Sequence, residues 1–329
     1  MIEVRGLSKH YGSTTAVDDV TFTVKPGMVT GFLGPNGAGK STTMRMIVGL
    51  DRPSAGSATV NGRPYAEHRA PLREVGVLLD AKAVHTGRSA RNHLRALAAT
   101  HGIAKARVDE VIALTGLESV ARKRVGGFSL GMGQRLGIAA ALLGDPATLI
   151  LDEPVNGLDP EGVIWVRTLA RHLASEGRTV FLSSHLMSEM AQTADHIIVL
   201  GRGKVVADAP VHQILEMAKG TAVRVRAPRS EALAELLRGD GVDVTADDGG
   251  RLRVTGITAP RIGELAASTG LVLHELTPLE GSLEDAYLAL TQGEVEYHAG
   301  ALPPSPDGSF PTAPSATMTA PTSATGGTR

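Results

Sequence analysis

The sequence predicts an α/β domain, followed by a small α+β domain and a disordered tail. Short apolar runs alternate with helical patterns through roughly the first 215 residues. A glycine-rich segment, residues 34–42, stands between one of these runs and a helical stretch. The composition changes after residue 220 and again after residue 299. These observations together favour a large domain that carries a binding loop and a smaller domain behind it.

Five runs in the first part have the composition of buried strands. Several are continuously apolar, as strands covered on both faces must be. The runs are Val29–Leu33, Val75–Leu79, Thr148–Leu151, Thr179–Leu182 and Ile197–Leu200. Between the second and third runs, apolar residues recur at helical spacing from residue 89 to 143. We therefore expect a domain over residues 1–215 with a helical subdomain at about 81–143.

The pattern from residue 221 to 291 predicts a separate βαββαβ unit, a ferredoxin-like accessory domain. Its expected elements are a strand at Ala222–Ala227, a helix at Glu231–Arg238, two strands around Gly249–Gly250, a helix at Arg261–Ser268, a strand at Leu271–Leu276 and a helix at Leu283–Leu290. Residues 299–329 are rich in Pro, Ser, Thr, Ala and Gly, which predicts disorder.

Composition excludes several classes of function. The 329 residues contain no cysteine, so disulfides, thiolate metal sites and cysteine nucleophiles are ruled out. The formal net charge of -1 gives no overall attraction to nucleic acid or anionic lipid. Neither a signal peptide nor an apolar run of about 18 residues is recognisable, so we expect no membrane span.

The segment from residue 34 to 42 fits the pattern of a phosphate-binding loop. Gly37 and Gly39 allow the backbone N–H groups to converge on phosphate oxygens, Lys40 supplies positive charge, and Ser41 is placed to hold magnesium. A glycine-rich turn without a ligand is the alternative, but the preceding strand and following helix favour the loop. The expected nucleotide-binding residues are Gly34, Pro35, Asn36, Gly37, Ala38, Gly39, Lys40, Ser41 and Thr42.

A second motif ends the strand at Thr148–Leu151 with two adjacent carboxylates. Asp152 would hold magnesium, directly or through water, and Glu153 would orient and polarise the attacking water. An isolated Asp-Glu-Pro triplet could merely end a strand and begin a turn. Combined with the upstream loop, it predicts hydrolysis of a nucleoside triphosphate.

With these motifs, residues 1–215 resemble the nucleotide-binding subunit of ABC transporters. The resemblance implies that Tyr11 stacks on adenine rather than serving as a partly buried core tyrosine. The family's signature, usually LSGGQ, reads here as Phe128–Met132, and its retained Ser129 and Gly131 would contact the γ-phosphate held by an opposing subunit. Leu130 and Met132 depart from that consensus. Without the family context the segment could simply cap a helix.

Two more residues gain roles from the same resemblance, and one position departs from it. His185 corresponds to the switch histidine that contacts the γ-phosphate, and the loop Asn156–Asp159 to the one through which two ATP sites communicate. Alone they would be an ordinary structural histidine and an Asx or glycine turn. Asp80 stands where the family has a glutamine. A carboxylate cannot donate a hydrogen bond at neutral pH, so we expect a magnesium-side or coupling role there.

The resemblance implies an ATPase that uses ATP and Mg²⁺ and works as a homodimer. Two ATP molecules would lie between the loop of one copy and the Ser129 segment of the other. The dimer would drive a separately encoded integral membrane permease from the cytoplasmic face of the cell membrane, without nucleic acid. The ending Glu275–Thr291 is similar to that of ATPases from bacterial drug and polysaccharide export systems of the daunorubicin-resistance type, which implies export of a drug or antibiotic.

Two other functions would also use a phosphate-binding loop. A soluble regulatory ATPase of the same fold could act on ribosomes or DNA, but such proteins usually carry two cassettes or a long coiled coil with basic linkers, which this chain lacks. A phosphate-loop kinase or GTPase would leave Tyr11, Ser129, Asp159 and His185 unexplained together, and the guanine-specificity motif is missing. Capture of membrane partners would separate the first two readings.

Overall fold

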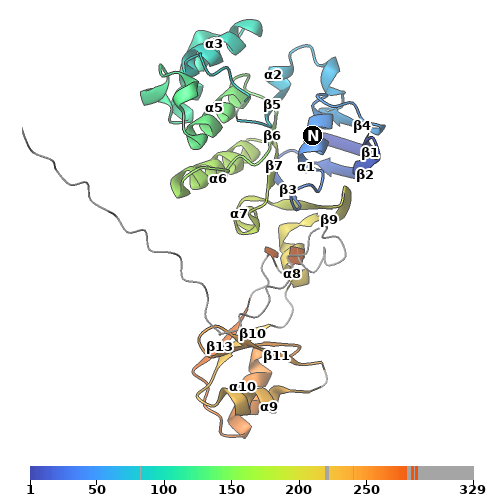
Figure 1. Cartoon of the computed structure of the whole chain (residues 1–329), viewed down its shortest axis with the longest axis vertical. Coiled ribbons are helices and arrows are strands. Elements are labelled where there is room, and N and C mark those ends of the chain that lie inside the picture. The colour runs from blue at the N-terminus through green and yellow to red at the C-terminus, as the bar shows by residue number, and fades with distance from the viewer. Residues whose placement is uncertain (82, 219–221, 240, 280–282, 285, 288–329) are drawn as a thin grey trace, which may run out of the picture. The chain divides into compact units, whose positions relative to one another are not determined.

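The computed structural model describes most of the chain (Figure 1). The described residues are 1–81, 83–218, 222–239 and 241–279, together with 283, 284, 286 and 287. The predicted tail at 299–329 and half of the residues of the predicted helix at Leu283–Leu290 lie outside them. None of the helices in the described part combines the length and apolar composition needed to span a bilayer.

Six strands of the described chain form the central sheet, in the order β5-β6-β7-β3-β8-β9. Every pairing is parallel except that of β8 with the edge strand β9. Every residue of β3, β6 and β7 is buried, which explains why these strands read as apolar runs. The five predicted strands are found within two residues at each end. The bounds are β3 Val29–Leu33, β5 Val75–Leu78, β6 Thr148–Leu151, β7 Thr179–Ser184, β8 His196–Gly201 and β9 Lys204–Pro210.

A second, antiparallel sheet in the order β2-β1-β4 was not among the sequence predictions. Its strands share an apolar core with one face of the central sheet. At the centre of this core, the rings of Phe22, Phe32 and Phe181 lie 5.1 to 5.7 Å apart between centroids, at separations that favour aromatic pairs. The bounds are β1 Ile2–Tyr11, β2 Thr14–Val24 and β4 Ala55–Val60.

Helices contribute to both of the large cores, and three of them form the predicted helical subdomain. Helix α3 contacts α4, and both contact α5. Helix α1 begins at Lys40 and ends at Ile47, and Gly49 beyond its end takes the left-handed backbone with φ +70°. The bounds are α1 Lys40–Ile47, α2 Pro71–Glu74, α3 Ala90–Thr100, α4 Lys105–Leu114, α5 Leu130–Leu142, α6 Pro160–Ser175, α7 Met187–Thr193 and α8 Val211–Ala218.

The described residues from 222 to 279 form a sheet with its own apolar core. The strand order β11-β12-β10-β13 is that of an antiparallel ferredoxin-like sheet. The last strand was predicted at Leu271–Leu276 but lies at Glu275–Pro278, because its pairing with β10 begins at Glu275 while Leu271 and Leu273 pack into the core. The bounds are β10 Val223–Arg226, α9 Ser230–Leu237, β11 Asp243–Asp247, β12 Arg251–Thr255, α10 Ala259–Ser268 and β13 Glu275–Pro278.

Candidate nucleotide-binding site

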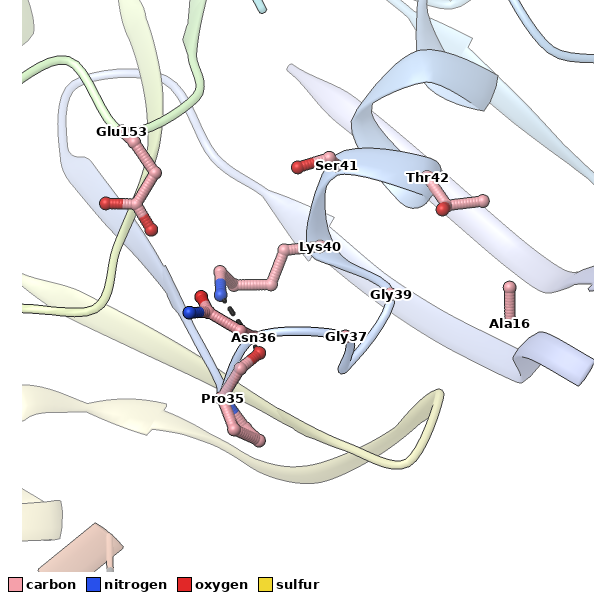
Figure 2. A pocket seen from close by; sticks show the side chains of 9 residues that line it. All are labelled: Ala16, Pro35, Asn36, Gly37, Gly39, Lys40, Ser41, Thr42 and Glu153. Carbon is pink, nitrogen blue, oxygen red and sulfur yellow. Dashed lines mark hydrogen bonds between the residues drawn. The ribbon is translucent and has the colours of Figure 1, made fainter. Parts of the chain in front are cut away.

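The loop between β3 and α1 encloses an open cavity (Figure 2). The loop needs its glycines for two reasons: some adopt positive φ angles, and some leave no room for a side chain. Gly37 and Gly39 have φ values of +84° and +102°. A Cβ on Gly39 would lie 2.4 Å from the carbonyl oxygen of Ala16, and one on Gly34 would lie 2.6 Å from that of Leu200. The cavity is lined by Ala16, Pro35, Asn36, Gly37, Gly39, Lys40, Ser41, Thr42 and Glu153.

Lys40 is a buried cation at the edge of this cavity. Its Nζ donates to the carbonyl oxygens of Gly34 at 2.7 Å and Pro35 at 3.2 Å. Burial lowers the pKa of Lys40, while the nearby Glu153 and Asp152 carboxylates raise it. Carbonyl groups are weaker partners for an ammonium group than phosphate oxygens are. The side chain is therefore well placed to exchange these carbonyls for the oxygens of a bound polyphosphate.

The start of α1 supplies the rest of an anion site. Its N-cap residue, Gly39, has no side chain that could accept a hydrogen bond from the first-turn N–H groups. Those N–H groups and the positive end of the helix dipole are free to meet an anion. Ala38 fixes the loop, since its carbonyl accepts a hydrogen bond from Gly203 N–H at 3.1 Å. The hydroxyl residues Ser41 and Thr42 then face the cavity (Figure 2).

The two carboxylates after β6 lie beside this cavity. Asp152 is 9% exposed and accepts a hydrogen bond from Ser183 Oγ at 2.5 Å. Glu153 projects toward the cavity (Figure 2), and its Oε2 lies 2.7 Å from Nδ1 of His185. Glu153 and His185 were predicted from two separate motifs. The structure brings them into direct contact across the ends of β6 and β7.

Three residues at this site were missed by the sequence analysis. Ala16 lines the cavity from β2, Ser183 bonds to both Asp152 and the Glu153 backbone, and Gln134 Nε2 donates to the Glu153 carbonyl at 2.6 Å. Two of them left a signal, because Ser183 follows directly on an apolar run and Gln134 occupies a buried position of α5. A polar residue at a buried position needs a hydrogen-bond partner.

The signature segment lies at the start of α5, where Ser129 is the N-cap and accepts a hydrogen bond from Met132 N–H at 3.2 Å. Within the described chain, neither Ser129 nor Gly131 lines the phosphate-loop cavity of its own subunit. A Cβ on Gly131 would lie 2.9 Å from the Gly157 carbonyl oxygen, and one on Gly157 would lie 2.3 Å from Leu130 Cδ2. The signature segment and the loop after Glu153 therefore pack directly against each other.

Tyr11 ends β1 with half of its surface exposed. Its hydroxyl donates to Asp51 Oδ2 at 3.2 Å, and Asp51 is held by both Nε and a terminal nitrogen of Arg45. The hydrogen bond from Arg45 is the main cause that lowers the pKa of Asp51. The Tyr11 hydroxyl also interacts with Thr42, a lining residue. An exposed ring fixed beside the cavity in this way can stack on a base.

Two other predicted residues have identifiable places. Asp159 caps α6, and its Oδ1 accepts a hydrogen bond from Gly162 N–H at 2.9 Å. This contact fixes the end of the loop Asn156–Asp159 at the start of α6. Asp80 follows β5 by two residues, so it lies at the same sheet edge as the carboxyl end of β6.

The donor set suits a magnesium ion that is bound together with a nucleotide. The described residues contain no cluster of three or more His, Cys, Asp or Glu side chains that could hold a metal on their own. Magnesium in nucleotide sites takes one or two protein oxygens and completes its shell with phosphates and water. The Ser41 hydroxyl and the buried Asp152 carboxylate have this chemistry.

Comparisons with known proteins agree with the site. The family model described as ABC transporter matches residues 17–156. A model described as an AAA domain, putative AbiEii toxin, matches residues 124–191 within the same α/β region, and a domain of unknown function matches residues 221–284.

Relatives extend the likeness to most of the chain. The bacitracin transport ATP-binding protein BcrA of Bacillus licheniformis is 36% identical over 299 residues, covering 89% of this chain and 98% of the relative. The Nod factor export ATP-binding protein I of Rhizobium sp. (strain N33) is 34% identical over 312 residues, covering 90% and 98%. A solved ATP-binding subunit of an ABC transporter is 29% identical, with a TM-score of 0.58 over 66% of this chain and 92% of the other. The chain thus belongs to the ATP-binding, ATP-hydrolysing subunits of the ABC transporter family.

Proposed function

We propose that this chain is the ATPase of an exporter, that it dimerises around two ATP molecules, and that it drives a separately encoded membrane permease from the cytoplasmic face of the cell membrane. The observation that carries the proposal is the contact between Glu153 and His185 beside the cavity that holds Lys40. A carboxylate that can activate water and an imidazole that can sense phosphate lie together next to a polyphosphate cradle.

Each residue of the site then has a defined task. Gly34, Pro35, Asn36, Gly37, Ala38 and Gly39 shape the loop, and Lys40, Ser41 and Thr42 hold the phosphates. Tyr11 stacks on the adenine, Glu153 polarises water, and His185 senses the γ-phosphate. Ser41 and Asp152 hold Mg²⁺, which neutralises developing phosphate charge when it is bound.

The second half of each site comes from the other copy. Ser129 and Gly131 lie away from the cavity of their own chain, at a helix start suited to phosphate. In the dimer they contact the γ-phosphate of the ATP held by the other copy. The backbone packing of Gly131 against Gly157 supports a second task, in which the loop Asn156–Asp159 reports on the neighbouring site.

The export direction and the cargo class are supported by the relatives, which are named for transport of bacitracin and export of Nod factor. We propose a drug, an antibiotic or another hydrophobic compound as the cargo. The domain limits that go with this function are 1–215 for ATP binding, with the helical subdomain at about 81–143, then 221–291 for the accessory domain and 299–329 for the tail. Asp80 is assigned a magnesium-side or coupling role.

Glu153→Gln tests the central assignment. Removing a general base costs on the order of 100-fold or more in turnover, so hydrolysis should fall by at least that factor while ATP binding persists. The blocked protein should accumulate as an ATP-bound dimer, measured by light scattering after size-exclusion chromatography. The matched control is Glu235→Gln on the exposed side of α9, which should leave both properties unchanged.

Lys40→Ala completes the test from the binding side. ATP affinity should fall because the buried ammonium group is removed from the phosphate cradle. Unchanged affinity in this variant would refute the cradle assignment. A Glu153→Gln protein that stays monomeric at saturating ATP would refute the dimer.

A further inference from the structure

Ser183 is the last residue but one of β7 and is fully buried, yet none of the roles above includes it. We propose that the Ser183 hydroxyl is a positioning group that holds the peptide of Glu153 in its catalytic conformation and ties it to Asp152. The proposal rests on the proposed role of Glu153 in hydrolysis and extends it to a residue that does not contact ATP itself.

The hydrogen bonds at Ser183 leave its hydroxyl no alternative arrangement. The single O–H donates to Asp152 Oδ1 at 2.5 Å, and the oxygen accepts from Glu153 N–H at 2.9 Å. An ionised carboxylate only accepts and a backbone N–H only donates, so a hydroxyl is the small group that satisfies both neighbours at once. Ser183 therefore links two consecutive residues of the β6 motif to β7.

The backbone at Glu153 explains why such a link is needed. Glu153 has φ +48°, in the left-handed region that residues other than glycine rarely adopt. A residue persists in this conformation only where its surroundings hold it. Here the N–H is held by Ser183 and the carbonyl oxygen is held by Gln134 Nε2 at 2.6 Å. The peptide groups on both sides of the Glu153 Cα are therefore fixed.

The left-handed turn sets the direction of the carboxylate. From this backbone the Glu153 side chain points into the cavity and meets His185 (Figure 2). Loss of the Ser183 hydroxyl would leave a buried Asp152 oxygen and the Glu153 N–H without partners, and both would gain by rotating the peptide toward water. The carboxylate would then leave the position from which it polarises the water that attacks the γ-phosphate, while Lys40 and the loop would stay in place.

The test compares Ser183→Ala with Ser183→Thr in the full chain. A small apolar space lined by Val163, Leu182 and Met190 adjoins Ser183 and can take the extra methyl group of threonine. We expect Ser183→Ala to lower kcat by about 10- to 100-fold, as misplacement of a catalytic group by about 1 Å does. The ATP dissociation constant, measured with a fluorescent ATP analogue, should change by less than about threefold. Ser183→Thr should restore most of the activity.

Thr179→Val is the matched control, because Thr179 is a buried hydroxyl residue at the opposite end of the same strand. Its Oγ1 accepts from the Met1 amino group, so this variant should lose thermal stability without losing kcat. A second arm, Gln134→Met, keeps the side-chain length but removes the donor to the Glu153 carbonyl. It should lower kcat in the same way and leave ATP affinity unchanged.

The outcomes separate this inference from the proposed function. If Glu153→Gln abolishes hydrolysis and Ser183→Ala keeps the kcat of the unmodified protein, the positioning role is wrong and the catalytic role of Glu153 stands. If Ser183→Ala and Ser183→Thr lose kcat and ATP affinity together, the residue is structural and the inference fails. If Glu153→Gln itself retains full hydrolysis, the assignment of the catalytic base fails first.

Discussion

At Glu153, backbone and side chain are held by residues from β7, from α5 and from the segment that follows β7. Ser183 of β7 holds the N–H, Gln134 of α5 holds the carbonyl oxygen, and His185 contacts the carboxylate. Because Ser129 is the N-cap of α5, the residue assigned to the other copy's ATP is joined through one helix to Gln134, which holds the carbonyl of the proposed catalytic base. One helix therefore connects the signature segment with Glu153.

Tyr11 carries the residue-scale prediction. If its ring stacks on adenine, Tyr11→Ala should weaken ATP binding by about 1 to 3 kcal/mol, the usual value of one base on one aromatic ring. Tyr11→Phe keeps the ring and loses only the hydrogen bond to Asp51, so its ATP affinity should stay within about fivefold of the unmodified protein, because such an exposed bond contributes about 1 kcal/mol or less. Isothermal titration with ATP measures both. Equal losses in the two variants would assign the effect to the Asp51 contact instead of stacking.

At the scale of elements, the parallel strands were predictable and the antiparallel sheet was not, for a physical reason. Strands buried on both faces are apolar throughout, and this signal does not depend on register. Strand β1 alternates, but its pairing with β2 shifts register between Val4 and Leu7, where Gly6 has φ +58°. After the shift the neighbouring residues Leu7 and Ser8 are both buried, so the alternation that Ile2 and Val4 begin does not continue, which hides the period of two.

The site also contains residues that could be predicted from the sequence and contacts that could not. Its loop residues could be predicted because they are contiguous, and their spacing is set by the backbone geometry of phosphate binding. The contacts of Ser183 with Asp152 and of Gln134 with Glu153 join residues 31 and 19 positions apart. They depend on the register of β6 with β7 and on how α5 packs, which no local pattern encodes. A buried polar residue indicates that a hydrogen-bond partner exists, but it does not show which residue that partner is.

The packing of Leu130 on Gly157 makes a prediction about two loops. Gly157→Ala should destabilise the fold by about 1 to 3 kcal/mol through overpacking, because its Cβ would lie 2.3 Å from Leu130 Cδ2. Its φ of +75° adds about 1 to 2 kcal/mol of backbone strain. Combining it with Leu130→Ala should remove the overpacking and leave the strain. Urea unfolding of the single and double variants gives the coupling energy.

Gly177→Ala is the control for that cycle, because Gly177 has φ +86° and nothing within 4 Å of the position of its Cβ. This variant measures the backbone strain by itself. The free energy of unfolding of the double variant should be at most about 1 kcal/mol below that of Gly177→Ala. The reason is that Leu130 is 48% exposed and contributes little to stability on its own. Additive losses in the cycle would show that Leu130 and Gly157 do not press on each other, and that the signature segment and the loop move independently.

At the scale of the whole molecule, the proposed function needs two copies of the chain for each ATP site and a separate membrane protein for the transport path. Ser129 and Gly131 lie outside the cavity that Lys40 and Glu153 line, so in the proposed dimer each chain would supply one half of two composite sites. The described part of the chain also holds no helix suited to spanning a bilayer. The region at 222–279 has its own core and sheet, and a family model of unknown function covers residues 221–284.

Affinity capture from detergent-solubilised membranes tests the transport assignment. The Met1 amino group donates hydrogen bonds to Asn61 Oδ1 and Thr179 Oγ1, both at 2.8 Å. A tag in front of Met1 would break these two hydrogen bonds, so the affinity tag should follow Arg329. We expect a multispanning protein to be recovered with the tagged chain, identified by mass spectrometry. The untagged strain is the control for background.

The Glu153→Gln chain with ATP should retain that partner, since its docking does not require hydrolysis. Recovery of ribosomes without any membrane protein would favour the soluble regulatory ATPase, because a regulator needs the dimer and its ATP sites but no channel.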